Sequence, residues 1–377
     1  MTSRNSAKSS FLGRDRGAFG RARLSPSRAT LLRAILFAAT WILFACSGPR
    51  WVQAADTDKV TLQREGSTSR ILLSGQILDY TGHSLKFRTT AGNAVRLYPA
   101  SQVVSVETPQ TDAHIKGLLD FSQKQIDDAR AEFKKALTLE PRTWVRREIL
   151  AMLVRCDLRM GDYKSAGLQF QILFKSDPTT RHFKLIPLIW APQHSDVGLK
   201  NTAQNWISQP TEILRLMGAC VLFGDAKYGD EATNELKKLT ISTDRRIHYL
   251  AEAQLRRTRL SAGNITRHEL QRWQNRIESM PEALRGGPYY VLGRAHLQRQ
   301  EHERAALALL WLPLVYDHDH HLAARACLEA ADALARIGQK TNAGTLYREV
   351  AARYPQTPFA QEASEILRTT SSNQSGR

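Results

Sequence analysis

The strongest constraint on the fold of this chain is a spacing of apolar residues that occurs three times in full and once in part. A small residue is followed after four positions by a bulky apolar residue, after three more by another apolar residue, and after five more by proline. The full copies are Ala129, Phe133, Ala136 and Pro141; Ala166, Phe170, Leu173 and Pro178; and Ala343, Tyr347, Val350 and Pro355; the partial copy is Ala305, Leu309 and Leu312. Residues three and four apart share one helix face, and proline blocks continuation of a helix. Each copy therefore predicts one amphipathic helix.

A second small or fairly small residue precedes each copy by twelve positions. These residues are Gly117, Val154, Gly293 and Ala331. Two helices of a hairpin cross closely only where the facing side chains are small, and the bulky residue one turn later fills the adjacent gap. The spacing therefore predicts helical hairpins that cross at these positions.

Helical periodicity runs from residue 111 to about residue 368. With these hairpins, it resembles the tetratricopeptide repeat family, whose unit repeats about every 34 residues. Residues 346–367 resemble the repeats of exported bacterial envelope proteins of this superfamily. The resemblance implies a mainly α fold, an α-α superhelix over residues 111–368. Residues 179–285 match poorly and predict degenerate repeats of the same solenoid, with a separate helical bundle as the alternative; Pro187 and Trp190 indicate an irregular junction there.

Residues 57–108 have a different rhythm. Five short runs rich in Val, Ile, Leu, Tyr and Thr alternate with turn-forming stretches, and residues 84–90 alternate apolar with polar. This pattern predicts five antiparallel strands. It resembles SH3-like or Sm-like proteins, which implies a small closed β-barrel that serves as a docking module.

A basic leader covers residues 1–54. Its apolar run, residues 35–45, is much shorter than the roughly 20 residues that span a membrane. Val52, Gln53 and Ala54 suit a signal peptidase. We predict a cleaved signal peptide, with an uncleaved membrane anchor or a lipoprotein acylated at Cys46 as alternatives. Residues 369–377 are polar and predict a disordered tail.

The charge does not predict a nucleic-acid partner. The chain carries a net charge of +17, but residues 1–54 hold nine basic residues and one acidic residue, so the leader alone carries +8. Because much of the basic excess lies in the leader, we expect no nucleic acid as a partner.

Three cysteines follow the leader: Cys156, Cys220 and Cys327. They are far apart, they form no C-x-x-C pair, and each lies in an apolar helical stretch. We predict that they are small buried hydrophobes.

Candidate binding residues follow from the resemblance alone. In the tetratricopeptide family, the first helix of each hairpin lines the concave face that binds ligands. Carried over, the candidates are Arg155, Arg159, Tyr290, Arg294, Gln298, Arg325 and Arg336, with Asp332 beside them. Guanidinium groups bind carboxylates through paired hydrogen bonds, so a protein or peptide partner is expected, and an acidic one suits the arginines. The alternative is a solvated helix face.

Residues 317–321 hold Asp317, His318, Asp319, His320 and His321, a density that could bind a divalent metal. The run falls between two predicted hairpins, where aspartate also caps helices. We predict caps there, and neither a metal nor a cofactor. The chain contains no G-x-S-x-G and no H-E-x-x-H motif, and we predict no catalytic residues.

These patterns predict a non-catalytic scaffold of the periplasm or cell envelope that binds a partner protein or peptide. One alternative is an enzyme whose site lies in the irregular centre around His194, Asp196 and Trp206. Another is a protein that binds cell-wall glycan through the β module.

Overall fold

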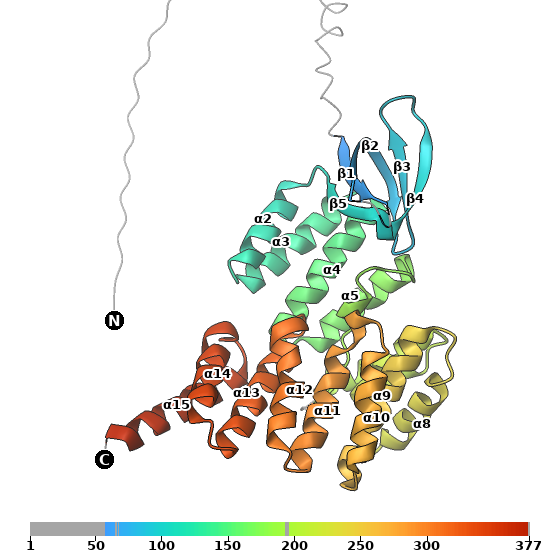
Figure 1. Ribbon diagram of the computed structural model, residues 1–377. Helices are drawn as coiled ribbons and strands as arrows, with labels where there is room; N and C mark the ends of the chain where they lie inside the picture. Colours follow the sequence, from blue (N-terminus) through green and yellow to red (C-terminus); the bar gives the residue numbers. More distant parts are fainter. Residues whose placement is uncertain (1–56, 65, 67, 193–195, 376–377) are drawn as a thin grey trace, which may run out of the picture. The chain divides into compact units, whose positions relative to one another are not determined.

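The computed structural model describes residues 57–64, 66, 68–192 and 196–375 (Figure 1). The predictions made for the leader, residues 1–54, lie outside these residues. Among the described residues, every helix lacks either the length or the apolar character that a membrane span requires.

The described strands lie where the sequence predicts them. They are β1 (Asp58–Gln63), β2 (Arg70–Tyr80), β3 (Ser84–Thr89), β4 (Val95–Pro99) and β5 (Val103–Glu107), and every neighbouring pair is antiparallel. The order across the sheet is β4-β3-β2-β1-β5.

The predicted closed barrel is wrong, because the sheet is open. Among the described strands, β4 pairs only with β3, and β5 pairs only with β1. The physical reason is that helices, rather than the far edge of the sheet, cover its apolar face. Val60, Leu85 and Phe87 on that face share one core with Phe133 and Ile149 of the first helices.

Buried polar contacts also join the sheet to the helices. Arg147 is buried and pairs with Asp79 of β2 and, at 3.9 Å, with Asp177. The Asp177 carboxylate in turn accepts a hydrogen bond from the Gly82 amide at 2.9 Å, in the β2–β3 turn. Sheet and helices therefore fall into one unit of contacts, residues 56–377.

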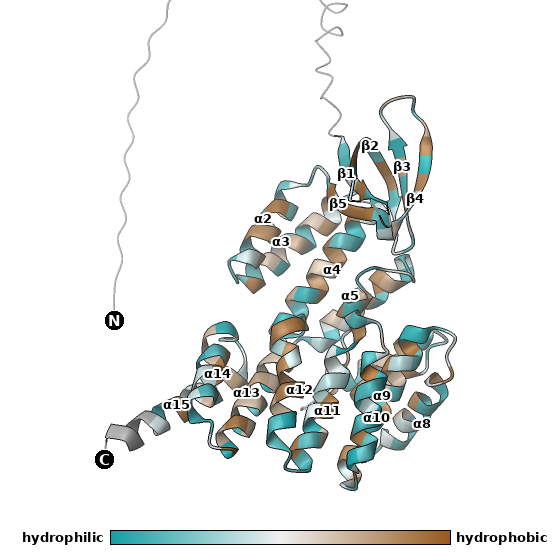
Figure 2. Ribbon diagram, in the orientation of Figure 1, coloured by the Kyte–Doolittle hydropathy of each residue, from teal (hydrophilic) through white to brown (hydrophobic). Residues whose placement is uncertain are grey.

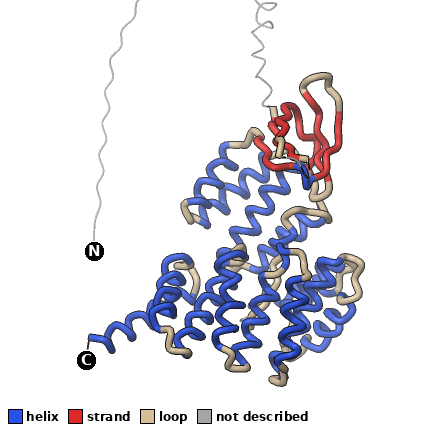
Figure 3. The backbone as a smooth tube through the Cα atoms, viewed as in Figure 1, coloured by secondary structure: helices blue, strands red, loops and turns tan. Residues whose placement is uncertain are grey.

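All other regular structure in the described residues is helical, as Figure 3 shows. The first two hairpins are α2 (Asp112–Ser122) with α3 (Ile126–Leu139) and α4 (Thr143–Met160) with α5 (Tyr163–Ser176). A short 3₁₀ turn, η2 (Phe183–Leu185), precedes the central helices α6 (Val197–Ile207), α7 (Glu212–Leu222), α8 (Gly229–Leu239), α9 (Arg245–Ala262) and α10 (Arg267–Glu278). The last helices are α11 (Gly286–Gln298), α12 (His302–Val315), α13 (His320–Arg336), α14 (Lys340–Arg353) and α15 (Pro358–Ser375).

The predicted small-residue crossings are confirmed. Ala129, Ala166, Ala305 and Ala343, which open the four copies of the pattern, are all buried on the second helix of their hairpins. On the first helices, a Cβ added at Gly117 would lie 2.9 Å from the Phe133 ring, and one at Gly293 would lie 2.6 Å from Leu309 Cγ. Nothing larger than glycine fits at these two crossings. Figure 2 shows hydrophobic and hydrophilic residues alternating around the helices.

The degenerate central region shares its core with the regular hairpins. Leu158 of α4, Leu216 of α7, Leu250 of α9 and Tyr290 of α11 belong to one continuous cluster of buried residues. Buried residues of the central helices therefore pack in the same cluster as residues of α4 and α11.

Residues 369–375, which the sequence predicts as part of a disordered tail, continue α15. The segment has no proline, and the Thr369 and Thr370 hydroxyls donate to the carbonyls of Glu365 and Ile366. Hydroxyls satisfied in this way are compatible with a continuing helix.

Candidate functional site

Three of the predicted binding residues converge on one carboxylate of the chain itself, Glu329 on α13. Its Oε1 accepts hydrogen bonds from the Tyr290 hydroxyl at 3.1 Å, from Arg294 Nη1 at 3.1 Å and from Arg325 Nε at 2.9 Å. Tyr290 is buried, and the pKa of its hydroxyl is raised above the usual value. Burial is the larger cause, and the negative charge of Glu329 adds to it. At Tyr290, Arg294 and Arg325, the carboxylate that the sequence analysis expects from a partner is therefore supplied by Glu329 of the chain itself.

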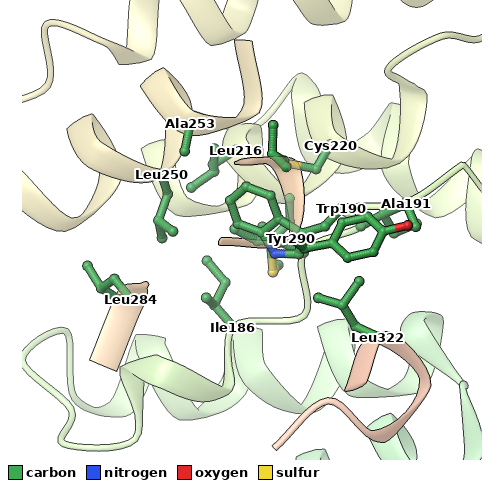
Figure 4. Packing of buried hydrophobic residues seen from close by; sticks show 14 of the residues in the cluster. Ile186, Trp190, Ala191, Leu216, Cys220, Leu250, Ala253, Leu284, Tyr290 and Leu322 are labelled. Atoms are coloured by element: carbon green, nitrogen blue, oxygen red, sulfur yellow. The ribbon is translucent and has the colours of Figure 1, made fainter. Parts of the chain in front are cut away.

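An irregular stretch of the chain occupies the space between these helices. Residues 186–192, which we call the inner segment, follow η2 and have neither helical nor strand structure. Its buried apolar side chains are Ile186, Leu188, Ile189, Trp190 and Ala191. Figure 4 shows Trp190 among side chains from other elements, including Leu216, Leu250, Tyr290 and Leu322.

Trp190 lies against the start of α11. A Cβ added at Gly287 would come within 1.9 Å of the Trp190 ring, so only glycine permits this approach. Gly287 therefore makes room for the indole, whereas the neighbouring Gly286 lies against Tyr316.

Side chains of the surrounding helices hold the main chain of the inner segment. The Ile189 carbonyl accepts from Gln254 Nε2 at 3.1 Å and from Arg257 Nη1 at 2.8 Å. The Pro192 carbonyl accepts from Arg325 Nη1 at 2.7 Å. Arg257 is buried, its pKa is lowered by that burial, and no carboxylate pairs with it within the described ranges. These helices thus bind an irregular segment mainly through apolar contacts and through its carbonyl groups.

The remaining candidates of the last two hairpins have different surroundings. Gln298 Nε2 donates to the Leu260 carbonyl at 2.9 Å, and Asp332 accepts from the Tyr347 hydroxyl at 2.7 Å. Arg336 is exposed at the end of α13. The structure therefore does not bring Arg336 into the Glu329 cluster.

Arg155 and Arg159 on α4 form a separate basic site. Both guanidinium groups lie over the Phe121 ring of α2, at 5.3 Å and 3.9 Å from its centroid. Burial and the neighbouring Arg155 lower the pKa of Arg159. No ion pair to either arginine exists among the described residues, so both keep guanidinium hydrogen bonds for a ligand.

The Asp317 and Asp319 side chains face different partners. Asp317 accepts from Arg353 Nη2 at 2.7 Å. Asp319 caps α13 by accepting from the Leu322 amide at 3.0 Å, and it also accepts from the buried Tyr163 hydroxyl. The cap predicted for this run is confirmed.

The three histidines of the run also diverge. His318 lines a small cavity beside Trp190, His320 is edge-on to Tyr354 at 5.3 Å between ring centroids, and His321 lies against Gly161. Burial lowers the pKa of His318 and of His320 to about 4, with nearby cations adding to the effect. No group of three or more His, Cys, Asp or Glu in the described part of the chain is placed to hold a metal ion.

Two of the three residues named for the alternative enzyme, Asp196 and Trp206, lie in the described ranges and have separate partners. Asp196 caps α6 by accepting from the Leu199 amide. Trp206 is buried against Gly167, and its Nε1 donates to Gln171 at 3.2 Å. His194 lies outside the described residues.

The three predicted buried cysteines are confirmed. Cys156, Cys220 and Cys327 are buried and free, and burial raises the pKa of each thiol to about 12. Thiols with so high a pKa are weak nucleophiles at neutral pH.

The role of the inner segment was missed by sequence reasoning. The sequence feature that could have indicated a buried non-helical segment is the apolar run "LIPLIWAP", residues 185–192, in which two prolines exclude a helix. Such a run fits either a buried strand or a buried irregular segment, and only the surrounding helices distinguish the two.

No family model matches the chain, and no curated protein matches it.

Proposed function

We propose that this chain is a non-catalytic scaffold that binds a partner protein or peptide in the cell envelope. Its hairpins are tetratricopeptide-like repeats that form an α-α superhelix, and the leader exports or anchors it. The proposal draws on the repeated small-residue crossings, which join the two helices of a hairpin, and on the contacts of α3 with α4 and of α12 with α13, which join neighbouring hairpins.

The observation that carries the proposal is the way in which the hairpins hold the inner segment. Gln254, Arg257 and Arg325 bind carbonyl groups of this non-helical segment, while Gly287 makes room for its tryptophan. Contacts to carbonyl groups do not require a particular side chain on the bound segment, and buried apolar contacts supply the free energy of binding. Helices that hold one non-helical segment in this way suit a protein that binds a peptide segment of a partner.

The inner segment already fills the space near α9, α11 and α13. The partner therefore binds on the α2–α4 side, where Arg155 and Arg159 have no ion pairs. A partner that presents carboxylates near these guanidinium groups gains charge-assisted hydrogen bonds.

The test is capture of partners from an envelope extract with the immobilised full-length protein. We expect the wild type to retain a partner in stoichiometric amount and the Arg155→Ala/Arg159→Ala double variant to lose it. Arg348→Ala removes an exposed arginine of α14 and is the matched control, which should retain the partner. Equal retention by all three proteins would show that α4 is not the binding face.

A further inference from the structure

A small cavity lies where the first hairpins meet the last. It has a volume of about 70 Å³ and is lined by Lys124, Ile126, Arg159, His320, Arg353, Tyr354, Pro355, Gln356 and Thr357. Lys124 follows α2, Arg159 belongs to α4, His320 begins α13, and residues 354–357 connect α14 to α15. Helices α4 and α13 contact each other directly. We propose that this cavity binds one oxyanionic group, a carboxylate or a phosphate.

The charge of the cavity wall favours an anion. Three cations line it, Lys124, Arg159 and Arg353, and no carboxylate does. Arg353 is paired with two acids that do not line the cavity, Asp317 at 2.7 Å and Glu349 at 3.5 Å. Within the described ranges, neither Lys124 nor Arg159 has an ion pair. Arg159 is half-buried and Lys124 is exposed, and the nearby Asp317 acts on Arg159 only at longer range. An anion in the cavity would give Arg159 a direct partner.

The second, independent observation is the Tyr354 hydroxyl. Tyr354 lines the cavity, is only 1% exposed, and its hydroxyl has no hydrogen-bond partner among the described residues. A buried hydroxyl without a partner costs free energy that a bound acceptor recovers. An anion oxygen is such an acceptor.

His320 completes the polar wall. Its ring is edge-on to Tyr354 at 5.3 Å between centroids. Burial, followed by the charge of Arg159, lowers its pKa to about 4, so the imidazole is neutral near pH 7 and retains one N–H donor. The positive charge near pH 7 therefore comes from the arginines and the lysine.

The size of the cavity limits what enters it. About 70 Å³ accommodates a single carboxylate or phosphate group, and the wall also includes the apolar side chains of Ile126 and Pro355. The group is either a free ion or the charged end of a larger molecule that remains outside. The inference does not depend on the proposed function, because the cavity binds its anion whether or not α4 also binds a partner protein.

The test is isothermal titration of the full-length protein with inorganic phosphate and, separately, with acetate, at constant ionic strength. We expect saturable binding of at least one anion at a single site. Arg159→Gln should weaken it about tenfold, as loss of a charge-assisted hydrogen bond does. Arg348→Gln, at an exposed position of α14, is the matched control and should leave it unchanged.

Tyr354→Phe separates a binding role from a structural one. It should weaken anion binding several-fold while the midpoint of thermal unfolding stays the same or rises, because the variant removes a buried hydroxyl that has no partner. A peptide with a free C-terminal carboxylate, compared with its amidated form, distinguishes a chain terminus from a free ion as the source.

Absence of binding by both phosphate and acetate would overturn the inference. Equal affinity of the wild type, Arg159→Gln and Tyr354→Phe would also overturn it, because the anion would then bind elsewhere. Failure of the envelope capture experiment alone would leave the inference intact.

Discussion

The Tyr163 hydroxyl donates a hydrogen bond to the Asp319 carboxylate, 2.9 Å from Oδ2 and 3.1 Å from Oδ1. The two residues are 156 positions apart, at the start of α5 and at the N-cap of α13. Burial raises the pKa of Asp319 to about 6, although the hydrogen bonds from the Leu322 amide and Tyr163 act in the opposite direction. This contact therefore joins the second hairpin to the last helices at some cost in charge burial.

Asp319 makes a pH-dependent contribution to stability. Its folded-state pKa of about 6 lies above the ordinary value of 3.8, so folding favours the protonated acid. The stabilising effect is present in full below pH 3.8 and is lost as the pH rises through 6. Asp319→Asn stays neutral and keeps an acceptor oxygen for Tyr163. Above pH 6 we therefore expect the free energy of unfolding of this variant to exceed that of the wild type by up to about 3 kcal/mol.

The measurement is the free energy of unfolding in urea, for both proteins, from pH 4 to pH 8. The difference between them should widen with rising pH. A constant difference across this range would contradict the assigned burial of the Asp319 charge.

The hairpin crossing at Gly293 tests the packing rule. Gly293→Ala places a Cβ 2.6 Å from Leu309 Cγ, and overpacking of this kind costs about 1–3 kcal/mol. Gly344→Ala is the control, because the same added methyl group on α14 meets nothing within 4 Å. Alanine favours a helix over glycine by about 1 kcal/mol, so the control variant should be stabilised. Chemical denaturation of the two variants should give changes of opposite sign, and equal changes would argue against close crossing.

Removal of the Trp190 side chain should destabilise the helices around it. Trp190→Ala leaves a void beside Gly287 and α11, and loss of a buried tryptophan costs about 3–5 kcal/mol. Trp311→Ala removes the same side chain from a position that is 44% exposed and should cost much less. Thermal unfolding followed by circular dichroism provides the comparison. Similar losses in the two variants would mean that the inner segment contributes little to the core.

The ion pairs of Arg147 should hold the sheet on the helices. Arg147→Ala leaves the buried Asp177 without its cation, and a broken buried pair costs about 3–5 kcal/mol. Arg348→Ala, at an exposed site, should stay within about 0.5 kcal/mol of the wild type. Limited proteolysis should cut the β2–β3 turn faster in Arg147→Ala than in the control. Unchanged cleavage would indicate that apolar packing alone anchors the sheet.

Local patterns were sufficient to predict the strands and the hairpin crossings. Alternation and turn residues placed β2 and β3 correctly, because side-chain direction alternates along any strand. Gly117 and Gly293 were predictable as crossing points because close approach depends on the size of individual residues. Whether the sheet closes into a barrel was not predictable in this way. It depends on what covers Val60 and Phe87, which can be the opposite side of a closed barrel or, as here, the helices after residue 111.

The candidate site was less accessible to sequence reasoning. The positions of Tyr290 and Arg325 along their helices follow from periodicity, but the presence of Glu329 as their shared acceptor is a tertiary contact. The cavity at Tyr354 also joins residues from the two ends of the helical region. No pattern within a single hairpin connects Arg159 to Tyr354.

The place of the inner segment in the chain has a consequence for biosynthesis. Residues 186–192 leave the ribosome before α9, α11 and α13, the helices that later enclose them. The C-terminal hairpins therefore pack against a segment that has already been synthesised, and this segment sets the distance between them. A fragment that begins after residue 196 would lack this segment, and the apolar side chains that the segment covers would be exposed to water. Such a fragment should therefore aggregate rather than fold.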